Sequence, residues 1–157
     1  MKRNRQLIII GILMLTLMML VLSTLTKTDV SFDDHQLTRV KIGNQEIKVE
    51  IVNTAASITK GLSGRAQIGT DGMLFIFPTK RQASFWMKEM KFSLDLIWIK
   101  DNQIIQITPD VPAPDQDIYE SLLPTYQPDG QVDMVLEVLS GSAQKWGLKP
   151  GDRLAFF

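Results

Sequence analysis

The sequence predicts a mainly β domain, a compact sandwich or barrel with one or two short helices, preceded by a single N-terminal transmembrane helix. Three observations support this prediction. An uncharged apolar run occupies residues 7–25, short segments of alternating apolar and polar residues recur through the rest of the chain, and turn residues separate these segments. Short period-two segments between turns are typical of β-rich domains.

The apolar run has the length and the flanking charges of a membrane anchor. Its 19 residues carry no charge, and about 20 apolar residues span a bilayer as a helix. Lys2, Arg3 and Arg5 precede it, so the positive-inside rule predicts an exported domain. A cleaved signal peptide, and hence secretion, is the alternative, although no Ala-x-Ala-like site follows the run. The predicted order is cytoplasmic residues 1–6, a signal-anchor over 7–25, a linker over 26–36 and an extracytoplasmic domain over 37–157.

The composition excludes several kinds of site. The chain has no cysteine, which excludes disulfides, thiol catalysis and thiolate metal sites. Its only histidine, His35, lies in the predicted linker, where we expect it to be solvated, so a His-rich metal site or a Ser-His-Asp triad is not predicted. Three of the 17 basic residues precede the anchor, against 17 acidic residues in all, so the domain is mildly acidic. We therefore expect no nucleic-acid partner, no metal and no cofactor.

The first half of the domain shows a hairpin, a helix and a buried strand. Ile47, Val49 and Ile51 alternate with polar residues, and five apolar residues from Met73 to Phe77 are closed by Pro78. The predicted elements are a hairpin over 38–52 with its turn at Gly43-Asn44, a short helix over 53–62, a strand buried on both faces over 73–77 and a solvent-exposed turn over 79–83.

The second half continues with strands and one short helix. The predicted elements are extended structure over 85–88, a strand over 92–99, a turn at 101–102, a strand over 104–107, a strand over 132–138, a helix over 140–146 capped by Gly147, and a final strand over 153–157. Period two in the strand over 132–138 places Val132, Met134, Leu136 and Val138 inward, and Asp133, Val135 and Glu137 outward.

A long segment, residues 108–131, separates the predicted strand over 104–107 from the predicted strand over 132–138. Its 24 residues include five of the seven prolines and no Lys or Arg. Loops of this length are uncommon in compact domains and are often functional or disordered. We expect this one to pack over the domain through Tyr119 and Tyr126. Residues 115–120 resemble part of a calcium loop but lack its central glycine, so no metal site is predicted there.

Polar side chains in the aromatic segment 72–99, in the irregular segment before it and in a later strand suggest a binding cleft. The candidate residues are Arg65, Trp86, Lys88, Asp95 and Glu137. In such a cleft, Arg or Lys binds an anionic group and a carboxylate serves as acid, base or hydrogen-bond acceptor. The alternative is structural: a Lys88–Asp95 or Arg65–Asp95 pair that sets strand register. For Trp86, packing in the core is favoured over a stacking platform for a sugar or peptide.

Several spaced motifs resemble one family, catalogued as domain of unknown function 192. They are Gly64-Arg65, Gly72-Met73-Leu74-Phe75, Phe77, Phe85-Trp86-Met87-Lys88, Leu94-Asp95, Val135-Leu136-Glu137, Gly141, Gly147 and Gly151-Asp152. The resemblance spans roughly Val40 to Phe157. The chain departs from the family at Glu89-Met90, where the family often has Asn-Thr. The resemblance implies a compact, mainly β domain that is often exported or membrane-anchored, and it implies no established activity.

Two functions remain open from the sequence. The first is a binding or accessory module at the cell envelope, held to the membrane through residues 7–25 and facing an envelope ligand or protein partner. The second is a small metal-independent hydrolase or lyase that uses carboxylates with Lys88 or Arg65. Convergence of Lys88, Asp95 and Arg65 in an open pocket would favour the enzyme.

Overall fold

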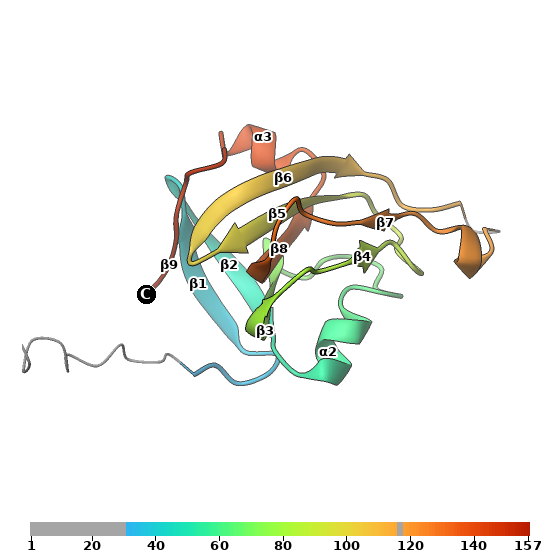
Figure 1. Ribbon diagram of the computed structural model, residues 1–157, viewed down its shortest axis with the longest axis horizontal. Coiled ribbons are helices and arrows are strands. Elements are labelled where there is room, and N and C mark those ends of the chain that lie inside the picture. The colour runs from blue at the N-terminus through green and yellow to red at the C-terminus, as the bar shows by residue number, and fades with distance from the viewer. Residues whose placement is uncertain (1–30, 116–117) are drawn as a thin grey trace, which may run out of the picture. The chain divides into compact units, whose positions relative to one another are not determined.

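Seven strands form one curled sheet in the order β6-β5-β8-β3-β2-β1-β9, and β4 pairs with β7 in a separate two-stranded ribbon (Figure 1). The strands of the computed structural model are β1 (Leu37–Ile42), β2 (Gln45–Val52), β3 (Gly72–Arg81), β4 (Phe85–Trp86), β5 (Leu94–Lys100), β6 (Gln103–Val111), β7 (Thr125–Tyr126), β8 (Val132–Leu139) and β9 (Leu154–Phe156). The helices are α2 (Ala55–Lys60), α3 (Ser142–Lys145) and a 3-10 turn (Glu120–Leu122). The predicted mainly β class with one or two short helices is confirmed.

The structure describes residues 31–115 and 118–157, and Phe32–Phe157 forms one compact unit. The predicted cytoplasmic residues 1–6, the predicted anchor over 7–25 and residues 26–30 of the predicted linker lie outside the described residues. Within the described ranges, no helix is long and apolar enough to span a bilayer.

The direction in which neighbouring strands pair follows from the segments that connect them. Gly43-Asn44 and Asp101-Asn102 connect antiparallel hairpins, β1 to β2 and β5 to β6, as predicted. The pair β2–β3 is parallel. A parallel pair needs a crossover, and the segment that contains α2 supplies it. Thr54 caps α2 by accepting a hydrogen bond from the backbone N–H of Ser57.

The two edge strands of the curled sheet meet at one end. The backbone N–H of Ile104 on β6 donates to the carbonyl of Asp152 at 2.8 Å, and the N–H of Leu154 on β9 donates to the carbonyl of Asn102 at the same distance. A bridge between Gln103 and Arg153 joins the same strands. These contacts shield edges that would otherwise present unpaired backbone groups.

Both faces of the sheet are buried, which corrects the prediction for β8. Leu74, Ile97 and Leu136 belong to one apolar cluster, inside the curl, whereas Phe75 and Val135 belong to a second cluster on the opposite face. Residues from α2, β4 and β7 pack over this second cluster. Val135 and Glu137, predicted to face outward, are therefore buried. Alternation along a strand shows which residues share a face, but not whether another element covers that face.

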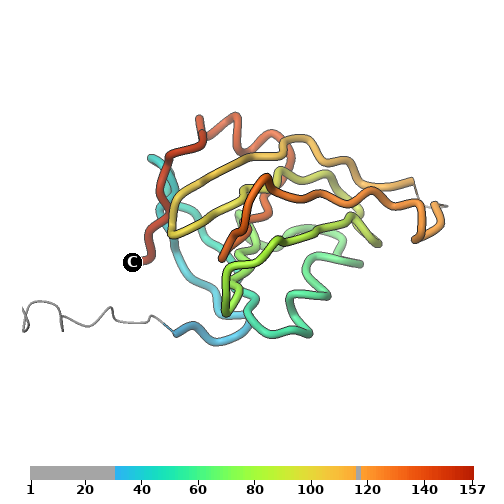
Figure 2. The backbone as a smooth tube through the Cα atoms, in the orientation of Figure 1, coloured from blue at the N-terminus to red at the C-terminus, as the bar shows by residue number. Residues whose placement is uncertain are grey.

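Two further predictions changed in the structure. The turn expected over 79–83 is the end of a longer β3, which runs through Pro78 to Arg81, while the expected solvent exposure is confirmed for residues 79–81. Pairing with β8 shifts in register between Ile76 and Arg81, and this irregularity accommodates a proline that has no N–H to donate. The 108–131 segment is partly regular: β6 extends to Val111, and β7 pairs with β4 (Figure 2).

Candidate functional site

A pocket of about 450 Å³ opens between α2, the second half of β3 and β4. Its apolar walls are Ile58, Leu62, Phe75, Phe77, Phe85 and Met90. Its polar lining includes Asn53, Lys60, Ser63, Arg81, Ser84 and Glu137, and Trp86 completes the rim. A mostly apolar cavity of this size with a few polar groups is the usual form of a small-ligand site.

Glu137 places a carboxyl group among these apolar walls. It lies on β8 between Met73 of β3 and Leu96 of β5, and it is only 5% exposed. Gly72 allows the strands to approach closely here, since a Cβ at that position would lie 2.8 Å from the carbonyl oxygen of Glu137. Burial raises the pKa of Glu137 to about 8, so the group is mainly protonated at neutral pH.

The carboxyl of Glu137 forms no hydrogen bond or ion pair with any described residue. Among the residues that the structure describes, no fully sealed side-chain oxygen or nitrogen lacks a hydrogen-bond partner. The carboxyl of Glu137 must therefore reach accessible space, and the pocket is the space that it lines. An unpartnered acid in an apolar pocket is a candidate functional group, because nothing in the fold compensates its burial.

Trp86 stands at the rim of the pocket and not in the core. Its side chain is 42% exposed, so the core position favoured from the sequence is wrong. The ammonium group of Lys88 lies 5.5 Å from the centre of its ring. The buried tryptophan is Trp98, which is fully inaccessible and packs edge-to-face against Phe85. Because the indole is exposed, a ligand could stack on its ring.

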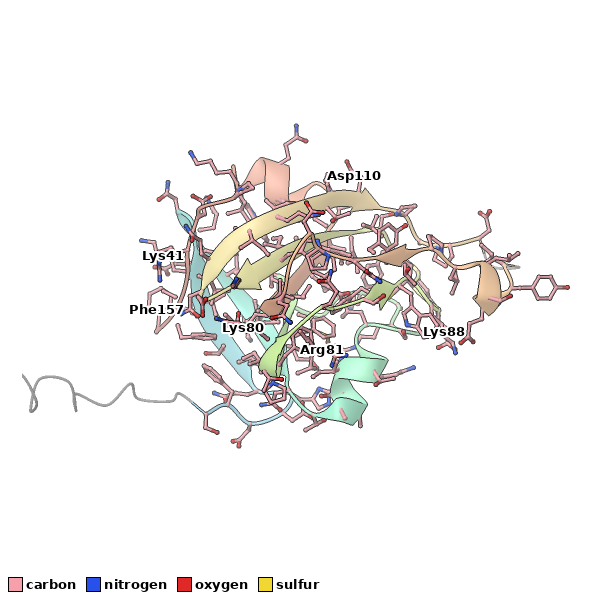
Figure 3. The ribbon with its side chains drawn as sticks, viewed as in Figure 1. Lys41, Lys80, Arg81, Lys88, Asp110 and Phe157 are labelled. Carbon is pink, nitrogen blue, oxygen red and sulfur yellow. The ribbon has the colours of Figure 1, made fainter. Side chains whose placement is uncertain are left out.

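The other three predicted site residues do not converge. Lys88 forms an ion pair with Glu120 at 2.7 Å, beyond the end of β4 (Figure 3). Arg65 pairs with Glu50, and Asp95 binds backbone amides elsewhere. Neither predicted pair, Lys88–Asp95 or Arg65–Asp95, is among the ion pairs of the described residues. Of the five candidates, Trp86 and Glu137 line the same pocket.

Asp95 has a structural position. Its carboxylate accepts hydrogen bonds from the backbone N–H groups of Asp110, Gly141 and Ala143, at 3.0, 3.2 and 2.9 Å. Gly141 is the N-cap of α3, so Asp95 supplies the capping oxygen that a glycine side chain lacks. The buried carboxylate thereby joins β5, the end of β6 and the start of α3.

A polar cluster at Glu50 was missed from the sequence. Arg65 donates two hydrogen bonds to the Glu50 carboxylate, at 2.6 and 2.9 Å, and His35 Nδ1 lies 2.7 Å from Glu50 Oε1. His35 is exposed, as predicted, and its contact with Glu50 also joins residues 32–36 to the domain. Glu50 lies between two apolar residues of β2. If both faces of that strand had been recognised as buried, Glu50 would have been predicted to be a buried carboxylate that needs a partner. Within the described ranges, no three His, Asp or Glu side chains form a metal-binding group.

We expect Glu50→Gln to lower the free energy of unfolding by about 2 kcal/mol at pH 7, the range of hydrogen bonds to a charged group. Hydrogen bonds from Arg65 hold the pKa of Glu50 below its usual value, and His35 adds to the effect. This stabilisation is present above the unfolded-state pKa of about 4.5 and is lost as the pH falls through the lower folded-state pKa. Urea unfolding at pH 7 and pH 3 measures both values, and an equal loss at the two pH values would contradict the assignment.

Comparison with known proteins leaves the activity open. The family model DUF192, described as "Uncharacterized ACR", matches residues 38–156. A Sinorhizobium meliloti 1021 protein described as a "putative transcription regulator" has a similar crystal structure, with a TM-score of 0.69 and 28% identity over 80% of this chain and 98% of that one. A protein of unknown function from Novosphingobium aromaticivorans DSM 12444 has a TM-score of 0.68 and 26% identity over 83% and 99%. No curated protein matches the chain significantly.

Proposed function

Because the chain belongs to the uncharacterised DUF192 family, whose membership assigns no activity, we propose a function from the pocket itself: the domain is a binding module for a small organic ligand. The observation that carries this proposal is the Glu137 carboxyl, which is buried without a hydrogen-bond partner among the described residues and lines the pocket. A ligand with a hydrogen-bonding group would supply the missing partner. Trp86, exposed at the rim, offers a flat surface for the ligand to stack on.

We expect a screen of small organic compounds to find ligands that raise the thermal midpoint of the full-length chain, since a ligand that binds only the folded state stabilises it. Ser84→Trp, which adds bulk to the lining, is expected to abolish the shift. Lys100→Trp, on an exposed position of β5 outside the pocket, is the matched control and should keep it. Equal shifts in both variants would exclude the pocket as the binding site.

The place of action proposed is the cell envelope. The support is the uncharged run over 7–25 with Lys2, Arg3 and Arg5 before it, which together favour an anchor with an exported domain. Fractionation of cells separates this arrangement from secretion, because a soluble form that begins near Thr26 would show that the run is cleaved. The mildly acidic composition gives no support to a nucleic-acid partner.

A hydrolase or lyase is the second candidate, and one observation favours it. A carboxyl with a pKa near 8 inside a pocket is suited to general acid–base catalysis at neutral pH. Lys88 and Arg65, the cations first considered for this role, form ion pairs with Glu120 and Glu50 and do not line the pocket. If a pocket ligand is turned over, Glu137→Gln should abolish the turnover and leave the ligand bound. Unchanged turnover in that variant would remove this candidate.

A further inference from the structure

We propose that the Glu137 pocket selects amphiphilic organic carboxylates, with the apolar body against the phenylalanine walls and the carboxylate on the guanidinium of Arg81. This inference rests on the proposed binding function and specifies its ligand class. Arg81 was expected in a solvent turn, but it lines the pocket from the end of β3. Figure 3 shows Arg81 on the side of β3 that faces β4 and α2.

Two neighbouring cations on β3 differ in what they bind. Lys80 forms an ion pair with Asp101 at 2.6 Å, away from the pocket. Arg81 forms no ion pair with any carboxylate of the described residues, and its guanidinium lies 5.4 Å from the centre of the Phe77 ring. This ring is part of the pocket wall, so it holds the guanidinium beside the cavity. A guanidinium fork that has no carboxylate partner is suited to a planar carboxylate ligand.

The remaining charges of the pocket also favour an anion. Lys60 on α2 is the second lining cation, and it lies 3.7 Å from Glu89, which is outside the lining. Glu137 is the only carboxyl among the lining residues that the structure describes. Burial keeps it mainly protonated at neutral pH. An entering anion therefore meets two lining cations and a mainly neutral carboxyl, which can donate a hydrogen bond to a ligand oxygen.

The walls select an apolar ligand body. Phe75 and Phe85 pack edge-to-face with their ring centres 4.9 Å apart, and Phe77, Ile58 and Met90 add further apolar surface. Inorganic anions would leave this surface uncovered. A carboxylate attached to an aromatic ring or a short branched alkyl group would cover it and still reach Arg81 at the rim.

Three probes share a phenylpropyl group and differ only in the polar group at its end: phenylpropionate, phenylpropanol and phenylpropylamine. Their affinities are measured by calorimetric titration of the full-length chain in lipid nanodiscs, with empty nanodiscs subtracted. We expect the acid to bind at least about tenfold more tightly than the alcohol, the gain of roughly one charge-assisted hydrogen bond, and the amine to bind most weakly. Arg81→Gln should remove the advantage of the acid over the alcohol. Lys80→Gln, the adjacent and already paired cation, is the matched control and should keep it.

The pH supplies a second readout. Between pH 7 and pH 9, Glu137 loses its proton, and a carboxylate at the floor would repel the bound acid, so its affinity should fall by up to about tenfold. Lys60 from α2 and Arg81 from β3 are the charged residues that share the pocket lining with Glu137, while Glu50 lies across Met73 on β2. Glu137→Gln should remove this pH dependence and retain binding.

Equal or tighter binding of the alcohol or the amine would overturn the inference, as would equal losses in Arg81→Gln and Lys80→Gln. If no probe binds, the inference fails, and the broader screen still decides the proposed binding function. If the probes bind equally well to Ser84→Trp, they bind outside the pocket, and both the inference and the proposed function are contradicted.

Discussion

Replacing Glu137 by Gln is expected to raise the free energy of unfolding by about 3 kcal/mol at pH 7. Burial raises the pKa of this carboxyl to about 8, whereas an exposed glutamate in the unfolded chain has a pKa of about 4.5. At pH 7 the unfolded chain has released the proton, and the folded protein still holds it. About 2.5 pH units separate pH 7 from the unfolded-state value, at about 1.4 kcal/mol each. Gln is neutral at every pH, so it avoids this cost.

The sign of the pH dependence distinguishes this effect from a change in packing. A carboxyl with a raised folded-state pKa makes the folded protein less stable as the pH rises from about 4.5 to about 8. The gain from Glu137→Gln should therefore be small at pH 4, grow through neutrality and level off above pH 8. Glu46→Gln, an exposed glutamate on β2, serves as the control and should change stability little at any pH.

Chemical unfolding from pH 4 to pH 9 measures this profile. A gain that is independent of pH, or a loss at pH 7, would show that Glu137 is not buried as a neutral acid. A growing gain would show that the protein carries a group that weakens its own fold. Such local conflicts are expected at functional sites, where stability is sacrificed for binding or chemistry.

Replacing Trp98 by Ala is expected to lower the free energy of unfolding by about 4 kcal/mol, the range for removing a large buried aromatic side chain. Trp98 is fully inaccessible. Its indole N–H donates to Thr108 Oγ1 at 2.9 Å, and its ring packs edge-to-face on Phe85 with the centres 5.7 Å apart. The substitution removes all of these contacts and leaves a cavity next to the pocket wall.

Trp86→Ala is the matched control, because it removes the same side chain from a position that is 42% exposed. We expect it to cost less than about 1 kcal/mol, as for most surface substitutions. Trp98→Phe keeps an aromatic ring and should fall between the two if the alanine variant does not fold. Urea unfolding of the three variants measures how much each substitution lowers the free energy of unfolding. Equal costs at positions 86 and 98 would contradict the placement of Trp86 at the rim.

The local elements could be predicted because their signals are local. The hairpin at Gly43-Asn44, the turn at Asp101-Asn102 and the left-handed cap at Gly147 each depend on a few neighbouring residues. The family resemblance over the domain is confirmed for the same reason, since it depends on motifs in sequence order. Pro78 misled the prediction of β3, because a register shift across the sheet absorbs the missing N–H.

The candidate site could be predicted only in part. Glu137 and Trp86 were both among the candidates, although Glu137 was expected on the outward face of its strand, and both line the pocket. Arg65 and Lys88 were candidates as cations for an anionic group, but each bonds to a carboxylate elsewhere in the chain. Arg81 was assigned to a turn, because nothing near it in the sequence shows that α2 and β4 enclose a cavity beside it.

By itself, the sequence determined the mainly β class, most of the turns and strands, the family and the residue types available for chemistry. Only the tertiary structure decided which strand faces are covered, which charges are paired and where a cavity remains. The physical reason is that periodicity and turn propensity act over a few residues. The burial that raises the pKa of Glu137, and the absence of a carboxylate partner for Arg81 among the described residues, depend on strands and helices far apart in the chain.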